Sequence, residues 1–344
     1  MGLAVTLLGP GQVGIHEYEE PPLRPREVRL RTLYSGISAG TELTAYRDSS
    51  PYLSKQWDGE RRLFLDGEIS LRHPIDTWGY EEVGEVTEIG SEVTQVRSGE
   101  VIWGTWGHKS TAVVQEDWAA RRRLPPSVDP MVGIFSRIGA IALNAVLDAD
   151  VHVGEYVAVF GQGVPGLIAA QLARLNGGTV IAVDGIPKRL ELAKSLGAAH
   201  VIDFTKQNPA EEIKGLTENR GADVSIEISG SYRALHEAIR STAYNSKVVS
   251  SGFFQGEGIG LSLGEEFHHN RINVVSSQIF GVSLALDHRW TVERLERTVM
   301  ALAAEQKIGL KPLVTHVFGI DEAGDAFRLL DENPAEAVQV VLEF

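Results

Sequence analysis

Residues 157–184, VAVFGQGVPGLIAAQLARLNGGTVIAVD, decide the fold of this 344-residue chain. The stretch opens with an apolar run of the kind found in buried parallel strands, and a second apolar run ends on Asp184. Between the two runs, Gly161, Gly163 and Gly166 have the spacing G-x-G-x-x-G. Leucine and isoleucine then recur at helical spacing. The pattern therefore predicts a strand, a glycine turn, a helix and a second strand.

This unit has the parts of a dinucleotide-binding site. The glycines allow a tight turn and a close approach to pyrophosphate, and Pro165 suits the first helical turn because its missing N–H costs nothing there. The helix N-terminus offers free N–H groups to the phosphates. Asp184, 18 residues after the third glycine, can accept hydrogen bonds from the adenosine ribose. A carboxylate there repels the 2′-phosphate of NADP, so NAD is the expected cofactor. The predicted cofactor-binding residues are Gly161, Gly163, Val164, Pro165, Gly166, Asp184, Lys188 and Arg189.

A second G-x-G-x-x-G match lies near the N-terminus, at Gly9, Gly11 and Gly14. It is followed by IHEYEEPPLRP, which contains three prolines and has no helical period. We therefore interpret this match as a strand, a turn and a strand, and not as a phosphate site.

Composition limits the possible classes of function. Apolar residues make up 43% of the chain and charged residues 23%, which is typical of a globular protein. The net charge of −14 argues against a nucleic-acid or anionic-membrane partner. No apolar run approaches ~18 residues, so no transmembrane helix is expected, and the N-terminus does not resemble a signal peptide. The absence of cysteine excludes disulfides, a thiol nucleophile and a thiolate metal site. The cytoplasm is the expected location.

The remaining patterns divide the chain into three parts. Residues up to about 125 consist mainly of β-formers between glycine turns, interrupted by a polar stretch at 46–78 that we interpret as a lid or substrate loop. Strand and helix patterns alternate from 157 to 279, which predicts a doubly wound parallel sheet. The end of the chain reads as helix, strand, helix, strand.

The chain resembles the medium-chain dehydrogenase/reductase superfamily over nearly its whole length. The stretches that carry the resemblance are PPLRPREVRLRTLYSGIS, GYEEVGEV, the glycine unit, ELAKSLGAAHVID and LVTHVFGIDEAGDAFRLL. The resemblance implies an α/β protein with a GroES-like β-rich catalytic domain at 1–140, a Rossmann nucleotide-binding domain at 141–282 and a C-terminal part at 283–344 that completes the catalytic domain. SGISAGTEL, GYEEVGEV and residues 276–290 resemble most the branch that contains bacteriochlorophyllide a dehydrogenase.

The chain departs from this family at the zinc ligands. Zinc-dependent members have a cysteine before their GTD/GTE triplet, where this chain has Ser38 and Ala39 with one extra residue. Their G-H-E histidine is replaced by Tyr80, and our alignment places Arg137 or a neighbour at the third ligand position. The four-cysteine lobe that binds structural zinc is missing. Because catalytic zinc prefers three soft or borderline ligands, the resemblance implies no metal here.

In the absence of a metal, side chains must perform its catalytic role. The predicted catalytic residues are Thr41, Glu42, Tyr80, Glu81 and Arg137. Glu81 or Glu42 is a candidate base, and Tyr80 and Thr41 are candidates for holding the substrate oxygen, Thr41 by its match to the hydroxyl of the family's proton relay. Each has a plainer interpretation, since Glu81 could orient the backbone or pair with Arg137, and Tyr80 could be core packing.

Further alternatives concern residues near this predicted site. His108 could be turn surface, or it could form a zinc site with Glu42 and Glu81. The tryptophans Trp78, Trp103 and Trp106 could be core, or they could form a wall that stacks a ring-shaped substrate.

The sequence thus predicts a zinc-independent, NAD-dependent dehydrogenase that interconverts a secondary alcohol and a ketone, with a cyclic or sugar-like substrate. A zinc-free enone or quinone reductase of the same fold and a non-catalytic nucleotide-binding protein remain alternatives. The apolar strand at 272–282 predicts a homodimer, because the resemblance implies pairing there and an exposed apolar edge needs a cover.

Overall fold

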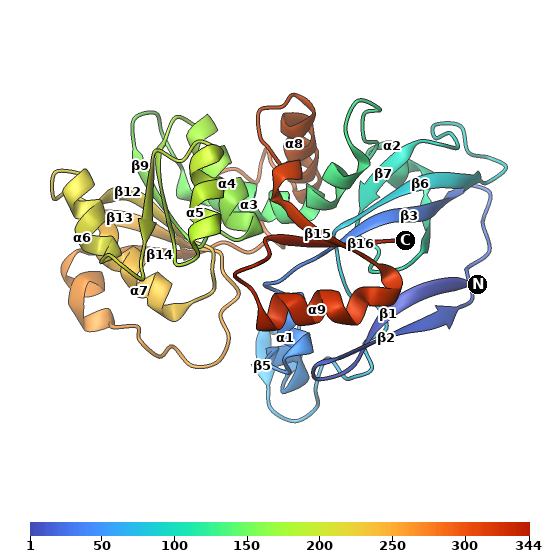
Figure 1. Cartoon of the computed structure of the whole chain (residues 1–344), viewed down its shortest axis with the longest axis horizontal. Coiled ribbons are helices and arrows are strands. Elements are labelled where there is room, and N and C mark those ends of the chain that lie inside the picture. Colours follow the sequence, from blue (N-terminus) through green and yellow to red (C-terminus); the bar gives the residue numbers. More distant parts are fainter. The chain divides into compact units, whose positions relative to one another are not determined.

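The computed structural model describes residues 1–344, which form two compact units. Unit 1 consists of Met1–Arg137 and Leu310–Phe344, and unit 2 consists of Ile138–Gly309. The elements of each are labelled in Figure 1. The chain leaves the first unit once and returns to it once.

The return to unit 1 comes later than the sequence predicted. We expected the C-terminal part of the catalytic domain to begin at residue 283, and the structure places this boundary at residue 310. The reason is helix α8 (Val292–Ala304), whose Val299 packs so closely on Gly139 that a Cβ there would lie 2.5 Å from it. The Gly309 N–H also donates to Gln171 at 2.7 Å. Residues 283–309 are thus held by unit 2.

Unit 2 is a six-stranded parallel sheet with helices. Its elements are the end of α3 (Phe135–Ala149), β9 (Tyr156–Phe160), α4 (Val164–Leu175), β10 (Thr179–Asp184), α5 (Pro187–Ser195), β11 (His200–Asp203), α6 (Pro209–Leu216), β12 (Ala222–Glu227), α7 (Tyr232–Ser241), β13 (Thr242–Ser250), η3 (Leu263–Phe267), β14 (Asn273–Ser276) and α8. The strand order is β11-β10-β9-β12-β13-β14, and all neighbours are parallel. This confirms the predicted doubly wound sheet.

The strand order places one functional point in the sheet. From β9 the chain first moves outward through α4 to β10, and after β11 it crosses back to β12 on the other side of β9. Right-handed crossovers in opposite directions put their helices on opposite faces. The carboxyl ends of β9 and β12 therefore form the switch point where such sheets bind ligands.

Unit 1 contains the β-rich sheet. Its elements are β1 (Gly2–Gly9), β2 (Gln12–Tyr18), β3 (Glu27–Ile37), α1 (Glu42–Tyr46), η1 (Pro51–Leu53), β4 (Gln56–Asp58), β5 (Leu63–Leu65), β6 (Glu82–Ile89), β7 (Val101–Gly104), β8 (Thr111–Gln115), α2 (Glu116–Ala120), η2 (Pro130–Ile134), the start of α3, η4 (Lys311–Leu313), β15 (Val314–Gly319), η5 (Ile320–Glu322), α9 (Ala323–Glu332) and β16 (Gln339–Glu343). The sheet order is β15-β16-β3-β6-β7, and β8 also pairs with β3. The C-terminal strands thus complete the sheet that the N-terminal strands begin.

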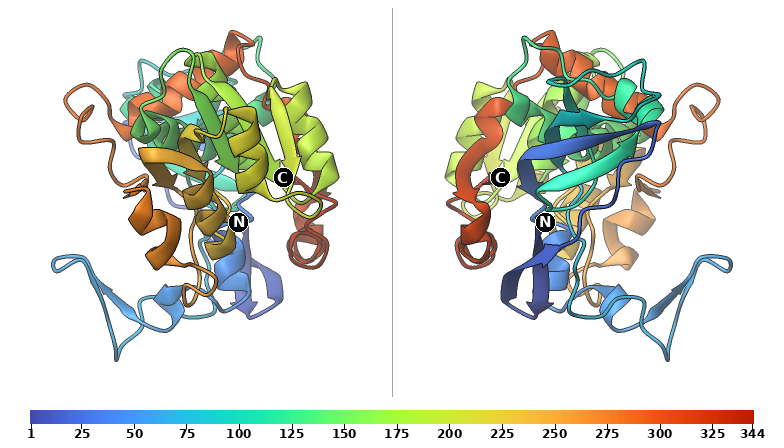
Figure 2. Two further views of the ribbon diagram at one scale, coloured as in Figure 1. Left: turned by 90° about the vertical axis from the view of Figure 1, so that its left-hand side faces the viewer. Right: turned by 90° about the vertical axis from the view of Figure 1, so that its right-hand side faces the viewer.

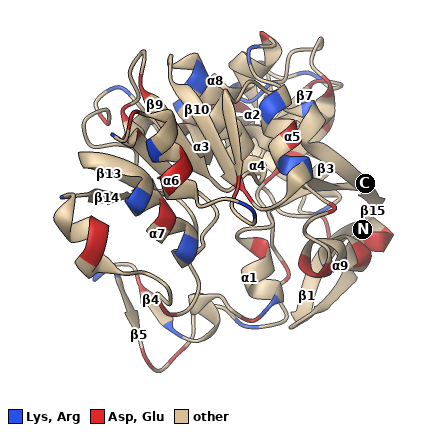
Figure 3. Cartoon of the chain, turned by 60° about the vertical axis from the view of Figure 1, so that its left-hand side comes forward, with Lys and Arg blue, Asp and Glu red and all other residues tan.

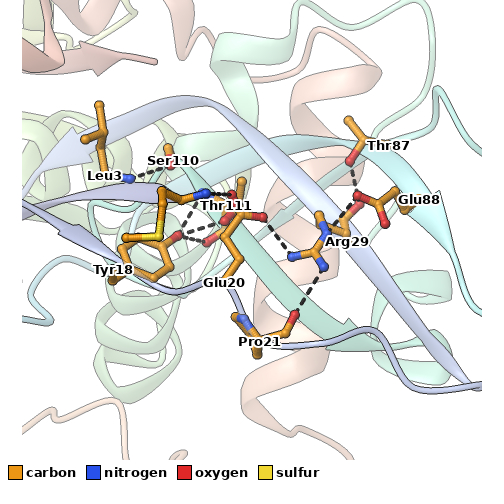
Figure 4. Close-up of polar contacts among 10 residues, drawn as sticks. Leu3, Tyr18, Glu20, Pro21, Arg29, Thr87, Glu88, Ser110 and Thr111 are labelled. Carbon is orange, nitrogen blue, oxygen red and sulfur yellow. Dashed lines mark hydrogen bonds and ion pairs between the residues drawn. The ribbon is translucent and has the colours of Figure 1, made fainter.

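The N-terminal glycine match is a hairpin, as predicted. β1 and β2 pair antiparallel, and Gly11 in the turn has φ +68°. Figure 4 shows how this hairpin is fixed to the main sheet: the Tyr18 hydroxyl donates to the Thr111 carbonyl at 2.9 Å, and Arg29 donates to Glu20 at 2.9 Å and to Glu88 at 3.0 Å. Tyr18 thus joins β2 to β8, Glu20 joins the segment after β2 to β3, and Arg29 also links β3 to β6.

The polar stretch at 46–78 contains a small hairpin of β4 and β5. Figure 2 shows it in light blue, extending away from β1 and β2 of the same unit. Trp57 lies on Phe64 with ring centroids 4.9 Å apart, and Tyr52 lies 5.2 Å from the same ring. The stretch has its own small aromatic cluster. Its predicted role as a lid or substrate loop stays a prediction.

Helix α9 supports the segment that carries the predicted catalytic residues. It has acidic residues near both ends, drawn red in Figure 3. Phe327 packs on Tyr46 of α1 with centroids 5.6 Å apart, and Arg47 pairs with Asp331 at 2.5 Å. The C-terminal helix therefore fixes α1, which begins at Glu42.

One helical stretch is longer and more apolar than the sequence analysis allowed. Residues Pro130–Ala149 satisfy length and hydropathy criteria for a membrane span, so the expectation that no such stretch exists is wrong. However, 72% of its most apolar window is buried within the protein. Its apolar residues therefore serve the protein core, as in a central helix of a folded domain.

Candidate functional site

The glycine turn of unit 2 joins β9 to α4. Gly161 has φ +94°, and a Cβ there would lie 2.7 Å from the Cβ of Ser229, so only glycine fits. A Cβ on Gly166 would collide with the carbonyl oxygen of Gly161. At Gly163, the N-cap of α4, a Cβ would meet nothing closer than Pro165 Cδ at 4.0 Å. The first and third glycines thus serve packing, and the middle glycine faces open space.

This open space suits a pyrophosphate. The Leu167 N–H makes the first intrahelical bond, to the Gly163 carbonyl at 2.9 Å, so the N–H groups of Val164 and Gly166 have no helical acceptor. The positive end of the helix dipole lies at the same place. Pro165 removes one N–H where none is needed. The predicted residues of the turn therefore fit the dinucleotide that the fold implies.

Asp184 has a structural task beside its predicted one. It ends β10 and is 7% exposed. Its carboxylate accepts the Gln162 N–H at 2.6 Å and the Ile186 N–H at 2.9 Å. It therefore holds both the glycine turn and the start of α5. The bonds to ribose stay a prediction, and each carboxylate oxygen has a second lone pair for them.

Two cations follow Asp184 on the first turn of α5. Lys188 is exposed and Arg189 is half-buried. Burial lowers the pKa of Arg189, and the charge of Asp184 partly opposes this, which shows that the two groups lie close together. The structure thus places a carboxylate and a guanidinium together where β10 ends and α5 begins, and their role in cofactor choice stays a prediction.

A further acid, Glu227, lies at the switch point, and sequence reasoning missed it. It ends β12 beside β9 and is fully buried. Its carboxylate accepts the N–H groups of Ser229 at 2.8 Å and Gly230 at 3.1 Å, and burial raises its pKa to about 7. The available signal was an acid that closes the strand pattern ADVSIE. It shapes the loop that packs against Gly161.

Three hydroxyl groups of unit 1 meet at the predicted catalytic position, and we call them the hydroxyl cluster. The Tyr80 hydroxyl lies 2.5 Å from Ser38 Oγ and donates to Thr41 Oγ1 at 3.3 Å. Burial raises the pKa of Tyr80, and the charge of Glu81 raises it further. Tyr80 is therefore a protonated donor at neutral pH. The structure brings Tyr80 and Thr41 together as predicted and adds Ser38.

Glu81 follows Tyr80 and is 1% exposed. Neither of its carboxylate oxygens has a hydrogen-bond partner. The Gln339 amide is near, but its two hydrogens go to the carbonyls of Ile37 at 3.1 Å and Val340 at 2.9 Å. Burial, followed by the charges of neighbouring glutamates, raises the pKa of Glu81 well above its ordinary value. The alternative ion pair of Glu81 with Arg137 is wrong, because the carboxylate bonds to nothing.

Glu42 and His108 form a buried pair. Glu42 is 0% exposed and His108 is 1% exposed, with His108 Nε2 and Glu42 Oε2 2.7 Å apart. The interpretation of His108 as turn surface is therefore wrong. WGHKS looked polar and turn-like, but Gly79 leaves space for the ring, since a Cβ there would lie 2.8 Å from it. Glu42 also accepts the Ser38 N–H at 2.9 Å, so its carboxylate is committed to these two groups.

The donor set at this position does not suit zinc. Ser38 and Tyr80 bond to each other, and Arg137 lies half-buried in the first turn of α3. Hydroxyl, phenol and guanidinium groups are not the thiolate, imidazole and carboxylate ligands that zinc prefers. The alternative site of Glu42, Glu81 and His108 does not form, since the only group of three possible metal ligands is elsewhere, at His236, Glu265 and Glu266.

The three tryptophans do not form one wall. Trp103 is 1% exposed and belongs to the core, and Trp106 packs on Trp118 with ring centroids 6.5 Å apart. The core interpretation is thus confirmed for these two. Trp78 is half-buried, and its indole N–H has no partner. It alone keeps a free polar group near the Gly79 turn.

Comparisons with known proteins agree with this geometry. The family model described as "Zinc-binding dehydrogenase" matches residues 165–296. D-guloside 3-dehydrogenase of Shigella flexneri is 28% identical over 342 residues, covering 97% of this chain and 98% of that protein. Sorbitol dehydrogenase of Halalkalibacterium halodurans is 26% identical over 372 residues, covering 99% and 98%.

Solved structures share the fold. A protein of Sinorhizobium meliloti classed as a zinc-binding dehydrogenase, bound to NADP, superposes with a TM-score of 0.78 at 23% identity, covering 100% of this chain and 99% of that one. The parallel sheet with its glycine turn, the β-rich sheet closed by the C-terminal strands and these full-length matches lead to one conclusion. The chain belongs to the medium-chain dehydrogenase/reductase superfamily.

Proposed function

We propose that this oxidoreductase is a zinc-independent, NAD(H)-dependent dehydrogenase that interconverts a secondary alcohol and a ketone. The observation that carries the proposal is the hydroxyl cluster of Ser38, Thr41 and Tyr80. Ser38 and Tyr80 occupy positions at which the family resemblance implies zinc ligands, Thr41 matches the hydroxyl of the family's proton relay, and the cluster presents a phenol that stays protonated. Such a group can bind a carbonyl or alcohol oxygen by hydrogen bonds, as an oxyanion hole does.

The proposed chemistry needs a hydride acceptor and a group that binds the substrate oxygen. The glycine turn and Asp184 would hold NAD, which would supply the hydride acceptor. Tyr80 donates its hydrogen to the substrate oxygen in place of Thr41 Oγ1, and Ser38 Oγ orients the phenol by donating to it. Glu81, which has no competing partner and a raised pKa, exchanges the hydroxyl proton. Arg137, whose charge is not among those that shift the pKa of Tyr80 or Glu81, takes no part in this step.

Asp184 supports NAD as the cofactor. A buried carboxylate at the end of β10 would repel a 2′-phosphate and bind ribose hydroxyls. The positive charges of Lys188 and Arg189 favour NADP instead, and the S. meliloti relative is bound to NADP. We favour NAD because Asp184 is fixed by two backbone bonds at the ribose position.

The substrate class follows from the relatives and from the donors in unit 1. D-guloside and sorbitol dehydrogenases oxidise polyhydroxylated compounds by their names, and both match this chain end to end. The hydroxyl cluster can bond the hydroxyl groups of such a compound. We therefore propose a cyclic or sugar-like secondary alcohol.

We also propose a homodimer formed through the edge of the unit 2 sheet. β14 is an edge strand, and Val274 on it is 39% exposed. Phe280 and Leu284, which follow it, are 89% and 88% exposed. Exposed apolar groups beside an open strand edge favour association. A monomer mass of 37.5 kDa by light scattering at micromolar concentration would contradict this.

The decisive experiment combines metal analysis with turnover. Purified protein is tested for oxidation of a panel of glycosides, polyols and cyclitols with NAD, before and after chelation. We expect well under one zinc per chain and turnover that chelation leaves unchanged. Stoichiometric zinc that is lost together with activity would overturn the zinc-independent mechanism. Binding of NADH without turnover of any alcohol or ketone would favour a non-catalytic nucleotide-binding protein.

A further inference from the structure

His108 is enclosed by hydrogen-bonding groups on both sides of its ring. It lies between β7 and β8 and is 1% exposed. Its Nε2 lies 2.7 Å from Glu42 Oε2, and its Nδ1 lies 2.6 Å from Ser35 Oγ. Ser35, itself fully buried, donates to Glu82 Oε1 at 3.2 Å. The ring is therefore linked to one carboxylate directly and to another through a hydroxyl.

Counting protons assigns the state of the ring. The Ser35 hydroxyl has one hydrogen, and it points to Glu82. With Glu42 and Glu82 as carboxylates, Nδ1 of His108 donates to Ser35 Oγ and Nε2 donates to Glu42; burial raises the pKa of Glu82 to about 7, and the charge of His108 opposes that rise. A histidine that donates from both nitrogens is an imidazolium.

The surrounding charges agree with this assignment. The titratable groups that face the ring are Glu42 and Glu82. Burial lowers the pKa of His108, but the charge and hydrogen bond of Glu42 and the charge of Glu82 outweigh it and raise the pKa above 6.5. Glu82 is also fixed by the N–H groups of Trp106 at 2.7 Å and Glu81 at 3.1 Å.

The pair is connected to the hydroxyl cluster through the backbone. The second oxygen of Glu42 accepts the Ser38 N–H at 2.9 Å, and Ser38 Oγ bonds the Tyr80 hydroxyl. We propose that His108, as a buried imidazolium paired with Glu42, is a positioning residue that holds the Ser38–Thr41 turn in the geometry needed to bind the substrate oxygen. This role rests on the proposed function, and the charge state of the ring does not.

The first test needs no substrate. Nitrogen-15 NMR of the ring at pH 7 should show two protonated nitrogens for His108. S35A removes the acceptor of Nδ1 and the link to Glu82, so it should lower the pH at which His108 titrates. A neutral His108 ring at pH 7 in the native protein would overturn the assignment.

The second test concerns positioning. H108Q keeps a donor toward Glu42 without the charge, and H152Q is the matched control. In H108Q the Ser38 amide proton resonance should move, since its acceptor Glu42 now faces an uncharged donor in place of the imidazolium, and kcat should fall by on the order of 10²-fold with a smaller change in KM. S35A should shift the pH profile of kcat in step with the His108 titration, which a purely structural role would not do.

The outcomes separate the two proposals. An unchanged Ser38 resonance in H108Q, or in S35A if H108Q does not fold, would refute the positioning role whether or not a substrate is known. An unchanged kcat in H108Q would refute it as well. If the native protein turns over no alcohol while the Ser38 resonance moves as expected, the proposed function fails and the positioning of the turn stands.

Discussion

Replacing Asp184 with serine tests two roles of one carboxylate. The carboxylate fixes the glycine turn through the Gln162 N–H at 2.6 Å and the start of α5 through the Ile186 N–H at 2.9 Å. It is also the predicted partner of the adenosine ribose. The change D184S removes a buried charge from both roles, and the two losses are measured by different assays.

The structure gives the expected size of each loss. An unsatisfied buried N–H costs about 1–3 kcal/mol, and a serine hydroxyl reaches at most one of the two groups, so at least one N–H is left unpaired and the free energy of unfolding should fall by at least ~1–3 kcal/mol. For a unit of this size that corresponds to a melting temperature lower by about 2–12 °C. Loss of a charge-assisted bond to ribose should weaken the preference for NADH over NADPH by ~1–3 kcal/mol.

Nicotinamide fluorescence titrations with both cofactors and a thermal melt of the apo-protein measure these quantities. D203S is the matched control, because Asp203 is the register partner of Asp184 on β11 and ends its strand in the same way. It should leave the cofactor preference unchanged. Equal affinity of the native protein for NADH and NADPH would refute the role in selection and favour Lys188 and Arg189 as readers of a 2′-phosphate. An unchanged melting temperature in D184S would refute the structural role.

Three further predictions concern other residues. G163A should fold normally but lose at least ~10-fold in NADH affinity, since its Cβ enters the open space at the start of α4. G166A should instead lower the melting temperature, because its Cβ meets the Gly161 carbonyl oxygen. Equal behaviour of the two variants in binding and melting assays would contradict this assignment. E81Q should lower kcat by ~10²–10⁴-fold and leave NADH affinity unchanged, and Y80F should lower kcat by a smaller factor. A kcat of E81Q equal to that of the native protein would exclude Glu81 as the proton-exchanging group. Because burial raises the pKa of Glu227 to about 7, this group destabilises the fold as pH rises from 4.5 toward 7, by up to about 3 kcal/mol. E227Q should remove that dependence in urea melts at pH 5 and pH 7.5, and an identical pH slope in both proteins would show that Glu227 titrates normally.

The nucleotide-binding unit was predictable in detail because its signals are local. Each strand is a short apolar run, each helix begins near a proline or a capping residue, and the glycine spacing has one structural meaning when strand and helix surround it. The apolar run that ends on Asp184 was predicted as a strand and forms β10 (Thr179–Asp184). The parallel direction of the strands followed from the alternation itself, because parallel strands need crossover helices.

The boundary at residue 310 could not be read in the same way. The helix pattern at 292–304 was recognised, but a helix says nothing about which core its apolar face meets. That depends on the absence of a side chain at Gly139, which lets Val299 approach. Such a contact joins positions 160 residues apart, and no local pattern reports it.

The buried acids of unit 1 show where sequence reasoning fails and why the failure is informative. GTEL, GYEE and WGHKS are polar stretches, and polar stretches are usually solvated. Here Glu42, Glu82 and His108 satisfy one another's hydrogen bonds, so the cost of burying each is offset by the others. Glu81 has no such partner and remains buried all the same. Natural folds rarely keep an unsatisfied buried carboxyl without a use for it, and this one lies directly after the phenol of the hydroxyl cluster. The residue that the structure leaves unpaired is therefore the one we assign to proton exchange, and the residues that it pairs are those we assign to support.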